Sequence, residues 1–268
     1  MMNAGAKALQ NADMHPIEVA FMRNLIAAMG VSAIIFIKGN HTLFKTDYLR
    51  GQLTRSAFGN VSLIVAFWTV SLLPLGDAAA LWFSVPLIVL VMSALFLKEK
   101  VGPWRWGAVL VGFIAVCLIA QPALQMNNGL GIAVGTLSAF LIATVSINLR
   151  HLGKRNEHPL TTTFYFLSSG TLFCGALLPF IWTGALLNEA LFWIVGMTAC
   201  VGLLSQLLKT QAFRLAEASL LSPFTYLSVL WAGILGWLFW DEIPDLSMAV
   251  GCILLILSNA VVMWRERK

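Results

Sequence analysis

The sequence predicts an all-α membrane protein that crosses the bilayer many times, and three observations indicate this fold class. First, 59% of the 268 residues are hydrophobic, only 11% are charged and the mean hydropathy is +0.84, whereas soluble domains carry about 25% charged residues. Second, the apolar residues form nine stretches long enough for a helix to cross the hydrocarbon layer. Third, the basic residues lie in alternate gaps between those stretches.

The predicted spans follow one another closely, so we expect antiparallel neighbouring helices in one bundle without a soluble domain. Residues 1–12 would cover only about 18 Å as a helix, against roughly 30 Å of hydrocarbon. We expect them to be the second half of a first helix whose beginning is missing, which gives ten helices nominally and nine complete ones here. The nine spans cover roughly residues 17–37, 57–74, 79–97, 103–120, 129–149, 160–182, 190–209, 218–240 and 246–264.

Every Lys and Arg except Lys7 and Arg23 lies in an alternate gap between spans, and the gaps between those carry acidic residues or no charge. Because loops rich in Lys and Arg stay on the cytoplasmic side, the pattern predicts a plasma (inner) membrane protein with a cytoplasmic C-terminus. It also places the loops 38–56, 98–106 and 150–159 in the cytoplasm. The basic residues of these gaps are Lys38, Lys45, Arg50, Arg55, Lys98, Lys100, Arg105, Arg150, Lys154, Arg155, Lys209, Arg214, Arg265, Arg267 and Lys268.

Charge and cysteine usage exclude several other classes. A formal net charge of +5 would suggest a nucleic-acid partner for a soluble protein, but here the excess cations face one leaflet, so we expect no nucleic acid. The four cysteines lie inside apolar runs without CxxC or Cys/His spacing. They are therefore interpreted as small core residues, and no disulfide, metal or cofactor is expected.

An internal repeat divides the chain into residues 1–125 and 126–268. The offset between the two copies is about 140 residues, or five helices, and an odd number of crossings inverts the second copy relative to the first. Inverted repeats are typical of secondary transporters, whose substrate site lies near the midplane between the repeats. The matching residues are Leu75, Asp77 and Ala78 with Leu215, Glu217 and Ala218, and Leu95, Phe96 and Glu99 with Leu238, Phe239 and Glu242.

The chain resembles the EamA-type transporters of the drug/metabolite transporter superfamily over nearly its whole length. The resemblance is carried by HPIEVAFMRNLIAAMG at 15–30, by LPLGDAAAL at 73–81, and by the long segments 86–116 and 216–244. It implies two inverted five-helix repeats, and transport of small metabolites that is coupled to a gradient or occurs by exchange.

Arg23 is the clearest candidate site residue, because an ionisable group inside a span costs about 2.5–3.5 kcal/mol on insertion scales and needs a partner or a function. Its guanidinium could hold a substrate carboxylate or phosphate. The alternative is structural: an internal ion pair with Glu18, or capping of carbonyl groups of a neighbouring helix. Lys7 could face the same cavity or extend to the interface from a helix end. His15 and Glu18 could relay a proton, although His-Pro is first of all a helix start.

Other polar groups complete the predicted cavity, and each could instead form a hydrogen bond between helices. Two prolines inside spans, Pro86 and Pro223, remove a backbone hydrogen bond, and we expect a break or a cavity near them. Lys209 lies at a predicted span end and is interpreted as an interface anchor. The further cavity candidates are Asn60, Trp82, Gln206 and Tyr226.

These observations favour a secondary transporter that moves a small polar or amphipathic metabolite by alternating access. The net positive charge of Lys7 and Arg23 favours anionic or zwitterionic solutes. A membrane-embedded enzyme or a non-transporting membrane scaffold is the alternative, but the sequence contains no HExxH or other cluster that such an enzyme needs. The expected partners are the lipid bilayer and a small-molecule substrate. Coupling to protons or other ions, and a homodimer, stay open.

Overall fold

The computed structural model describes residue 9 and residues 14–73, 78, 81–120, 129–181, 189–227 and 246–266. These residues form helices and connecting turns, and no strand occurs among them. The all-helical fold class that the sequence predicts is therefore confirmed. Residues 1–8 with Lys7, the segments 74–77, 121–128 and 182–188, and residues 228–245, which hold most of the predicted span 218–240, lie outside the described residues. The elements are α2 (Pro16–Ile37), η1 (His41–Phe44), α3 (Leu49–Leu72), α5 (Val85–Phe96), α6 (Pro103–Ala120), α7 (Gly129–Lys154), α8 (Pro159–Leu177), η2 (Leu178–Phe180), α9 (Glu189–Leu215), α10 (Ala218–Leu221), η4 (Pro223–Tyr226) and α12 (Leu246–Glu266).

Within the described residues, five helical segments are long and apolar enough to cross a bilayer, and many of their apolar side chains, such as Leu172 and Trp193, are exposed. An exposed apolar surface of this kind suits contact with lipid. The five segments are Pro16–Ile37, Leu49–Leu72, Gly129–Lys154, Pro159–Phe180 and Trp193–Leu215.

Three predicted boundaries are wrong. We expected the loop 150–159 to begin after residue 149, but α7 continues to Lys154. We expected residues 38–56 to form a loop, but α3 begins at Leu49 and includes Arg55. We also expected a span to end at Lys209, but α9 continues to Leu215. Backbone hydrogen bonds extend a helix past the last apolar residue wherever polar side chains find an interior surface or solvent, so a hydropathy boundary is not a helix end.

Both prolines that lie inside predicted spans mark helix breaks, as predicted. Pro86 lies in the first turn of α5, directly after a turn at residues 83–84. Pro223 begins η4 after the single helical turn of α10. The fixed backbone angle of proline and its missing N–H suit a first turn and interrupt a continuous helix.

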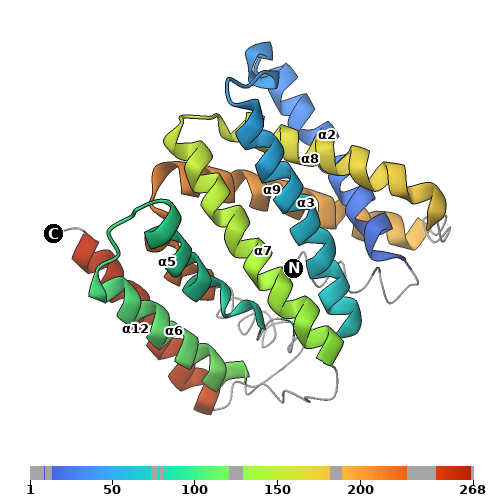
Figure 1. The fold of residues 1–268 in the computed structure, drawn as a ribbon. Coiled ribbons are helices and arrows are strands. Elements are labelled where there is room, and N and C mark those ends of the chain that lie inside the picture. Colours follow the sequence, from blue (N-terminus) through green and yellow to red (C-terminus); the bar gives the residue numbers. More distant parts are fainter. Residues whose placement is uncertain are drawn as a thin grey trace.

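The helices pack crosswise between the two halves of the chain (Figure 1). Helix α2 packs on α8 and α9, while α3 packs on α7 and α8. Helices α6 and α12 lie side by side at one edge of the bundle. The loops with basic residues meet at one end, where Thr46 donates a hydrogen bond to Glu157 and Lys154 donates to the carbonyl of Leu97. We call this end of the bundle the basic end.

Helices α2 and α8 begin in the same way. His15 and His158 each precede a proline, and each imidazole Nδ1 accepts a hydrogen bond from the backbone N–H two residues on, over 3.3 Å from Ile17 and 3.2 Å from Leu160. Such a cap satisfies one of the N–H groups that a helix start leaves unpaired. The two His-Pro pairs are 143 residues apart in the sequence, a repeat signal that our sequence analysis did not use.

Candidate functional site

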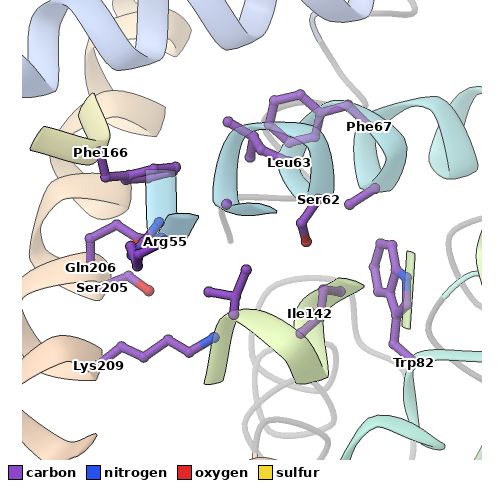
Figure 2. A pocket seen from close by; sticks show the side chains of 13 residues that line it. Arg55, Ser62, Leu63, Phe67, Trp82, Ile142, Phe166, Ser205, Gln206 and Lys209 are labelled. Carbon is purple, nitrogen blue, oxygen red and sulfur yellow. The ribbon is translucent and has the colours of Figure 1, made fainter. Parts of the chain in front are cut away.

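A cavity of about 200 Å³ lies between helices of the two halves of the chain. Helix α3 forms one wall, α7, α8 and α9 supply other walls, and the segment before α5 adds Trp82 (Figure 2). Polar groups gather at the end nearer the basic end, and apolar groups line the rest. The lining residues are Arg55, Gly59, Ser62, Leu63, Ala66, Phe67, Trp82, Ile142, Val145, Phe166, Ser205, Gln206 and Lys209.

Arg55 lies at the polar end of the cavity and is only 1% exposed. Its Nη2 donates a hydrogen bond to Oε1 of Gln206 over 2.9 Å, and its guanidinium lies over the Phe166 ring, 4.0 Å from the ring centre. The Nε and Nη1 atoms have no hydrogen-bond acceptor in the described part of the chain. A guanidinium does not lose its proton in proteins, so Arg55 keeps a buried positive charge with two unused donors.

The spacing of polar and small residues along α3 explains why Arg55 faces inward. Side chains three, four and seven positions apart lie on one face of a helix, so these residues form a single stripe directed at α8 and α9. This spacing was the signal that could have identified Arg55 from the sequence. The stripe consists of Gln52, Arg55, Ser56, Gly59 and Asn60, all of them buried.

Lys209 adds a second cation to the polar end. It lies three residues after Gln206 on α9, so the two side chains share one face of that helix. Figure 2 shows the lysine side chain extended along the cavity, and the lining residues that the structure describes include no acidic one. Our interpretation of Lys209 as an interface anchor is therefore wrong.

The opposite end of the cavity is apolar and includes one oriented aromatic ring. Leu63 and Phe67 of α3 and Ile142 of α7 line this end, and Trp82 closes it (Figure 2). The indole Nε1 of Trp82 donates a hydrogen bond to Ser138 Oγ over 2.6 Å, which fixes the orientation of the ring. The cavity thus has a cationic end and an apolar end.

Arg23 is buried beside the cavity but does not line it. It is 1% exposed, its Nη1 donates to Asn24 Oδ1 over 3.2 Å, and its Nε and Nη2 have no acceptor within the described residues. A methyl group at Gly202 would come within 2.7 Å of Arg23 Nε, so the glycine makes room for the guanidinium. Glu18 forms no ion pair with Arg23. Its carboxylate accepts the backbone N–H of His15 over 2.9 Å, as part of the cap of α2.

Of the other predicted site residues that the structure describes, two line the cavity and two form hydrogen bonds between helical elements instead. Trp82 and Gln206 line the cavity. Asn60 instead joins three helices, because its Nδ2 donates to the Phe166 carbonyl and to Ser169 Oγ while its Oδ1 faces Asn24 Nδ2 at 3.5 Å.

Tyr226 packs on Gly112, away from the cavity, and its hydroxyl donates to the carbonyl of Phe83 over 3.0 Å. It is 1% exposed. It therefore links η4 to the segment before α5. Lys7 lies outside the described residues.

A polar cluster around the buried Glu99, which the sequence analysis missed, lies at the basic end. The carboxylate of Glu99 accepts from Arg150 Nε over 3.3 Å and from the backbone N–H of Ser219 over 3.1 Å. Arg105 donates to both Glu217 and Ser219. These bonds tie the α5–α6 connection and α7 to the start of α10. We call Glu99, Arg105, Arg150, Glu217 and Ser219 the polar cluster.

A bundle of apolar helices around a cavity with two chemically distinct ends has the architecture of a membrane transport protein rather than an enzyme. The chain belongs to the EamA-like transporter family, which matches residues 3–121 and 129–264. It is therefore a multi-pass membrane transporter with the repeated all-helical fold of that family.

Several characterised relatives are similar over most of the chain. The chain is 27% identical to the pseudopaline exporter CntI of Pseudomonas aeruginosa, over 100% of this chain and 92% of the relative. It is 27% identical to an S-adenosylmethionine uptake transporter of Rickettsia bellii, over 95% and 86%. It is 31% identical to a riboflavin transporter of Rhizobium johnstonii, over 84% and 73%.

A solved crystal structure has the same fold. It matches 99% of this chain and 95% of its own length with a TM-score of 0.78 and 14% sequence identity. At this identity the likeness supports the fold alone.

Proposed function

We propose that the protein is a secondary transporter that moves a small polar or amphipathic metabolite by alternating access through the cavity. Two inverted repeats, residues 1–125 and 126–268, form the two sides. The observation that carries this proposal is the composition of the cavity wall, since α3 and Trp82 come from the first half and α7, α8 and α9 from the second. A relative motion of the halves would therefore open or close the cavity.

The crosswise packing of the helices supports the repeat. Helix α2 of the first half packs on α9 of the second, and α8 of the second packs on α3 of the first. Exchanging the halves, α2 for α8 and α3 for α9, leaves this set of contacts unchanged. A pseudo-two-fold relation of this kind is the geometry expected of inverted repeats.

The relatives support a small metabolite as substrate and leave the direction open, since one is named as an exporter and another as an uptake transporter. In the proposed topology the basic end and the C-terminus face the cytoplasm and the protein lies in the inner membrane. The polar cluster then closes the cytoplasmic side. Transport is coupled to a proton or ion gradient, or occurs by exchange.

The test is accumulation in proteoliposomes that hold the purified chain and receive a mixture of amino acids, S-adenosylmethionine and riboflavin. We expect one class of solute to accumulate, and an ionophore or the removal of the counter-solute to abolish its accumulation. Ser205→Trp, which fills the cavity, should abolish uptake. Leu204→Trp is the matched control, because Leu204 is the adjacent residue and is 59% exposed on the outer surface.

Uptake that is equal in Ser205→Trp and in the unaltered chain would refute transport through this cavity.

Labelling of a single cysteine at Asn40, in a background without the native cysteines, tests on which side of the membrane the basic end lies. Modification only from the cytoplasm is expected, and modification only from outside would overturn the topology. Light scattering on the purified chain in detergent, before it is reconstituted, distinguishes a monomer from a homodimer.

A further inference from the structure

We infer that the cavity binds an organic carboxylate, with the carboxylate between Arg55 and Lys209 and an apolar body against Phe67 and Trp82. This inference rests on the proposed function, because it names the substrate class of the same cavity. It goes beyond the earlier expectation of anionic or zwitterionic solutes by assigning the head group and the body of the ligand to the two ends of one site.

The unused donors of Arg55 provide the first argument. Gln206 accepts from Nη2 and the Phe166 ring covers one face of the guanidinium, so the group is held in one orientation. Its Nε and Nη1 still lack acceptors in the described part of the chain. An unpaired buried donor on a charged group is costly, and hydrogen bonds from a guanidinium to a carboxylate are among the stronger ones in proteins. A bound anion would remove this cost.

The accumulation of like charge provides the second argument. The positive charge of Arg23 is close enough to repel that of Arg55, and the charge of Arg55 in turn repels that of Lys209. Among the described residues that line the cavity, none carries a carboxylate that could offset these charges. Like charges repel strongly at low dielectric constant, so such a site disfavours cations and attracts an anion.

The apolar end determines what kind of anion fits. Beyond Ser62, the walls are Leu63, Phe67, Trp82 and Ile142, and the Trp82 ring is fixed by Ser138 (Figure 2). A small inorganic anion would leave this surface in contact with water. A ring or short chain attached to the carboxylate would bury this surface, which is favourable because it removes apolar area from water.

Thermal unfolding of the full purified chain in detergent tests this inference with matched probes. The probes 3-phenylpropionate, 3-phenylpropanamide and 3-phenylpropylamine share one body and differ in the head group. Acetate and inorganic phosphate supply anions without the body, all at equal ionic strength. We expect 3-phenylpropionate alone to raise Tm, by on the order of 3 °C at saturating concentration.

Variants of the two cations identify the site. Arg55→Gln and Lys209→Gln should weaken 3-phenylpropionate binding by on the order of 10- to 100-fold, because each loses a charge-assisted contact. Arg50→Gln is the matched control, since Arg50 lies on the same helix and is exposed at the basic end. Without ligand, Arg55→Gln should unfold at the same temperature as the unaltered chain or higher, because it removes an uncompensated charge. A merely structural arginine would lower it.

The possible results separate clearly. Equal stabilisation by the amine, an unchanged shift in both Arg55→Gln and Lys209→Gln, or no shift with 3-phenylpropionate would overturn the inference. Phosphate or acetate acting as strongly as 3-phenylpropionate would also overturn it, because the site would then be one for small anions. Binding of the carboxylate without accumulation of any solute in proteoliposomes would refute only transport. Accumulation of a neutral or cationic solute without carboxylate binding would refute only the substrate class.

Discussion

Helices α2 and α8 share their backbone setting but carry different side chains at one equivalent position that faces a glycine of the opposite half. Both begin with a His-Pro cap, and they pack on α9 and α3 respectively. Arg23 of α2 lies over Gly202 of α9, and Phe166, 143 residues further on, lies over Gly59 of α3. The two glycines are also 143 residues apart. The repeated frame therefore supplies two equivalent positions, of which one carries a charge and the other carries the ring that covers Arg55.

This difference teaches that the repeat determines the packing while a few substitutions determine the chemistry. A site built from identical halves would present the same group from both sides. Here the first half brings Arg55, with Arg23 buried beside the cavity, and the second half brings Phe166, Gln206 and Lys209. The resulting cavity is polar at one end only, which is what an asymmetric solute requires.

The largest effect is expected where the equivalent glycines are filled. A methyl group at Gly59 would meet Arg55 Nη1 and would also lie 2.9 Å from the Phe166 ring, whereas at Gly202 it would meet the movable end of Arg23, 2.7 Å from Nε. We expect Gly59→Leu to destabilise the fold by roughly 3 kcal/mol or more, and Gly202→Leu by clearly less, because overpacking costs most against a rigid neighbour. Denaturation in detergent measures both. Equal losses would contradict the comparison, and Gly59→Leu combined with Phe166→Ala should recover part of the stability.

The next largest effect is expected at Arg23, whose equivalent in the second half is the uncharged Phe166. Arg23→Gln should insert and fold with unchanged or higher Tm, because within the described residues no carboxylate pairs with Arg23. Its transport rate in proteoliposomes should fall by about tenfold or more, through the loss of a charge beside the anion site.

The double variant Glu18→Arg with Arg23→Glu separates this role from an ion pair. It should not recover transport, because Glu18 belongs to the helix cap. A recovered rate would make Arg23 a structural partner of Glu18.

Individual residues show which features of the structure could be predicted from the sequence and which could not. Apolar runs located the helices, and the prolines located the breaks at α5 and η4. Arg55 and Lys209 were assigned to loops because the alternation of charged gaps was applied to every cation near a span end. Yet Arg55 lies on the second turn of α3 and Lys209 on the last turns of α9.

Glu99 and its partners in the polar cluster could not be found from the sequence at all. Its contacts join residues 51, 119 and 120 positions apart. No local pattern reports such a pairing, because it depends on how the helices pack. Even so, the three-residue and four-residue spacing within 52–60 was sufficient to place Arg55 on an interior face.

The smallest effect concerns the shared cap. Burial lowers the pKa of His158, and the charges of Arg214 and Lys38 lower it further. The neutral imidazole accepts from Leu160, so protonation removes the cap. Stability from this group is therefore full above about pH 6.5, the ordinary histidine value, and is lost as the pH falls through the lowered pKa of the folded protein.

The expected loss is about 1 kcal/mol or less, read as a decrease in Tm between neutral and acidic pH. His158→Asn should keep the cap and flatten that part of the pH curve. A curve with the same slope in His158→Asn and in the unaltered chain would assign the pH dependence to other groups.

The position of Glu99 has a consequence for biosynthesis. Its carboxylate is buried against backbone N–H groups that lie 119 and 120 residues further along the chain, and a ribosome needs roughly 6 to 24 s to make that length at 5–20 residues per second. During this interval Arg150 is the first of its partners to be synthesised, 51 residues after Glu99. The nascent first half must therefore keep the Glu99 carboxylate in water until the second half is inserted, and its backbone partners are complete only when Ser219 has been synthesised.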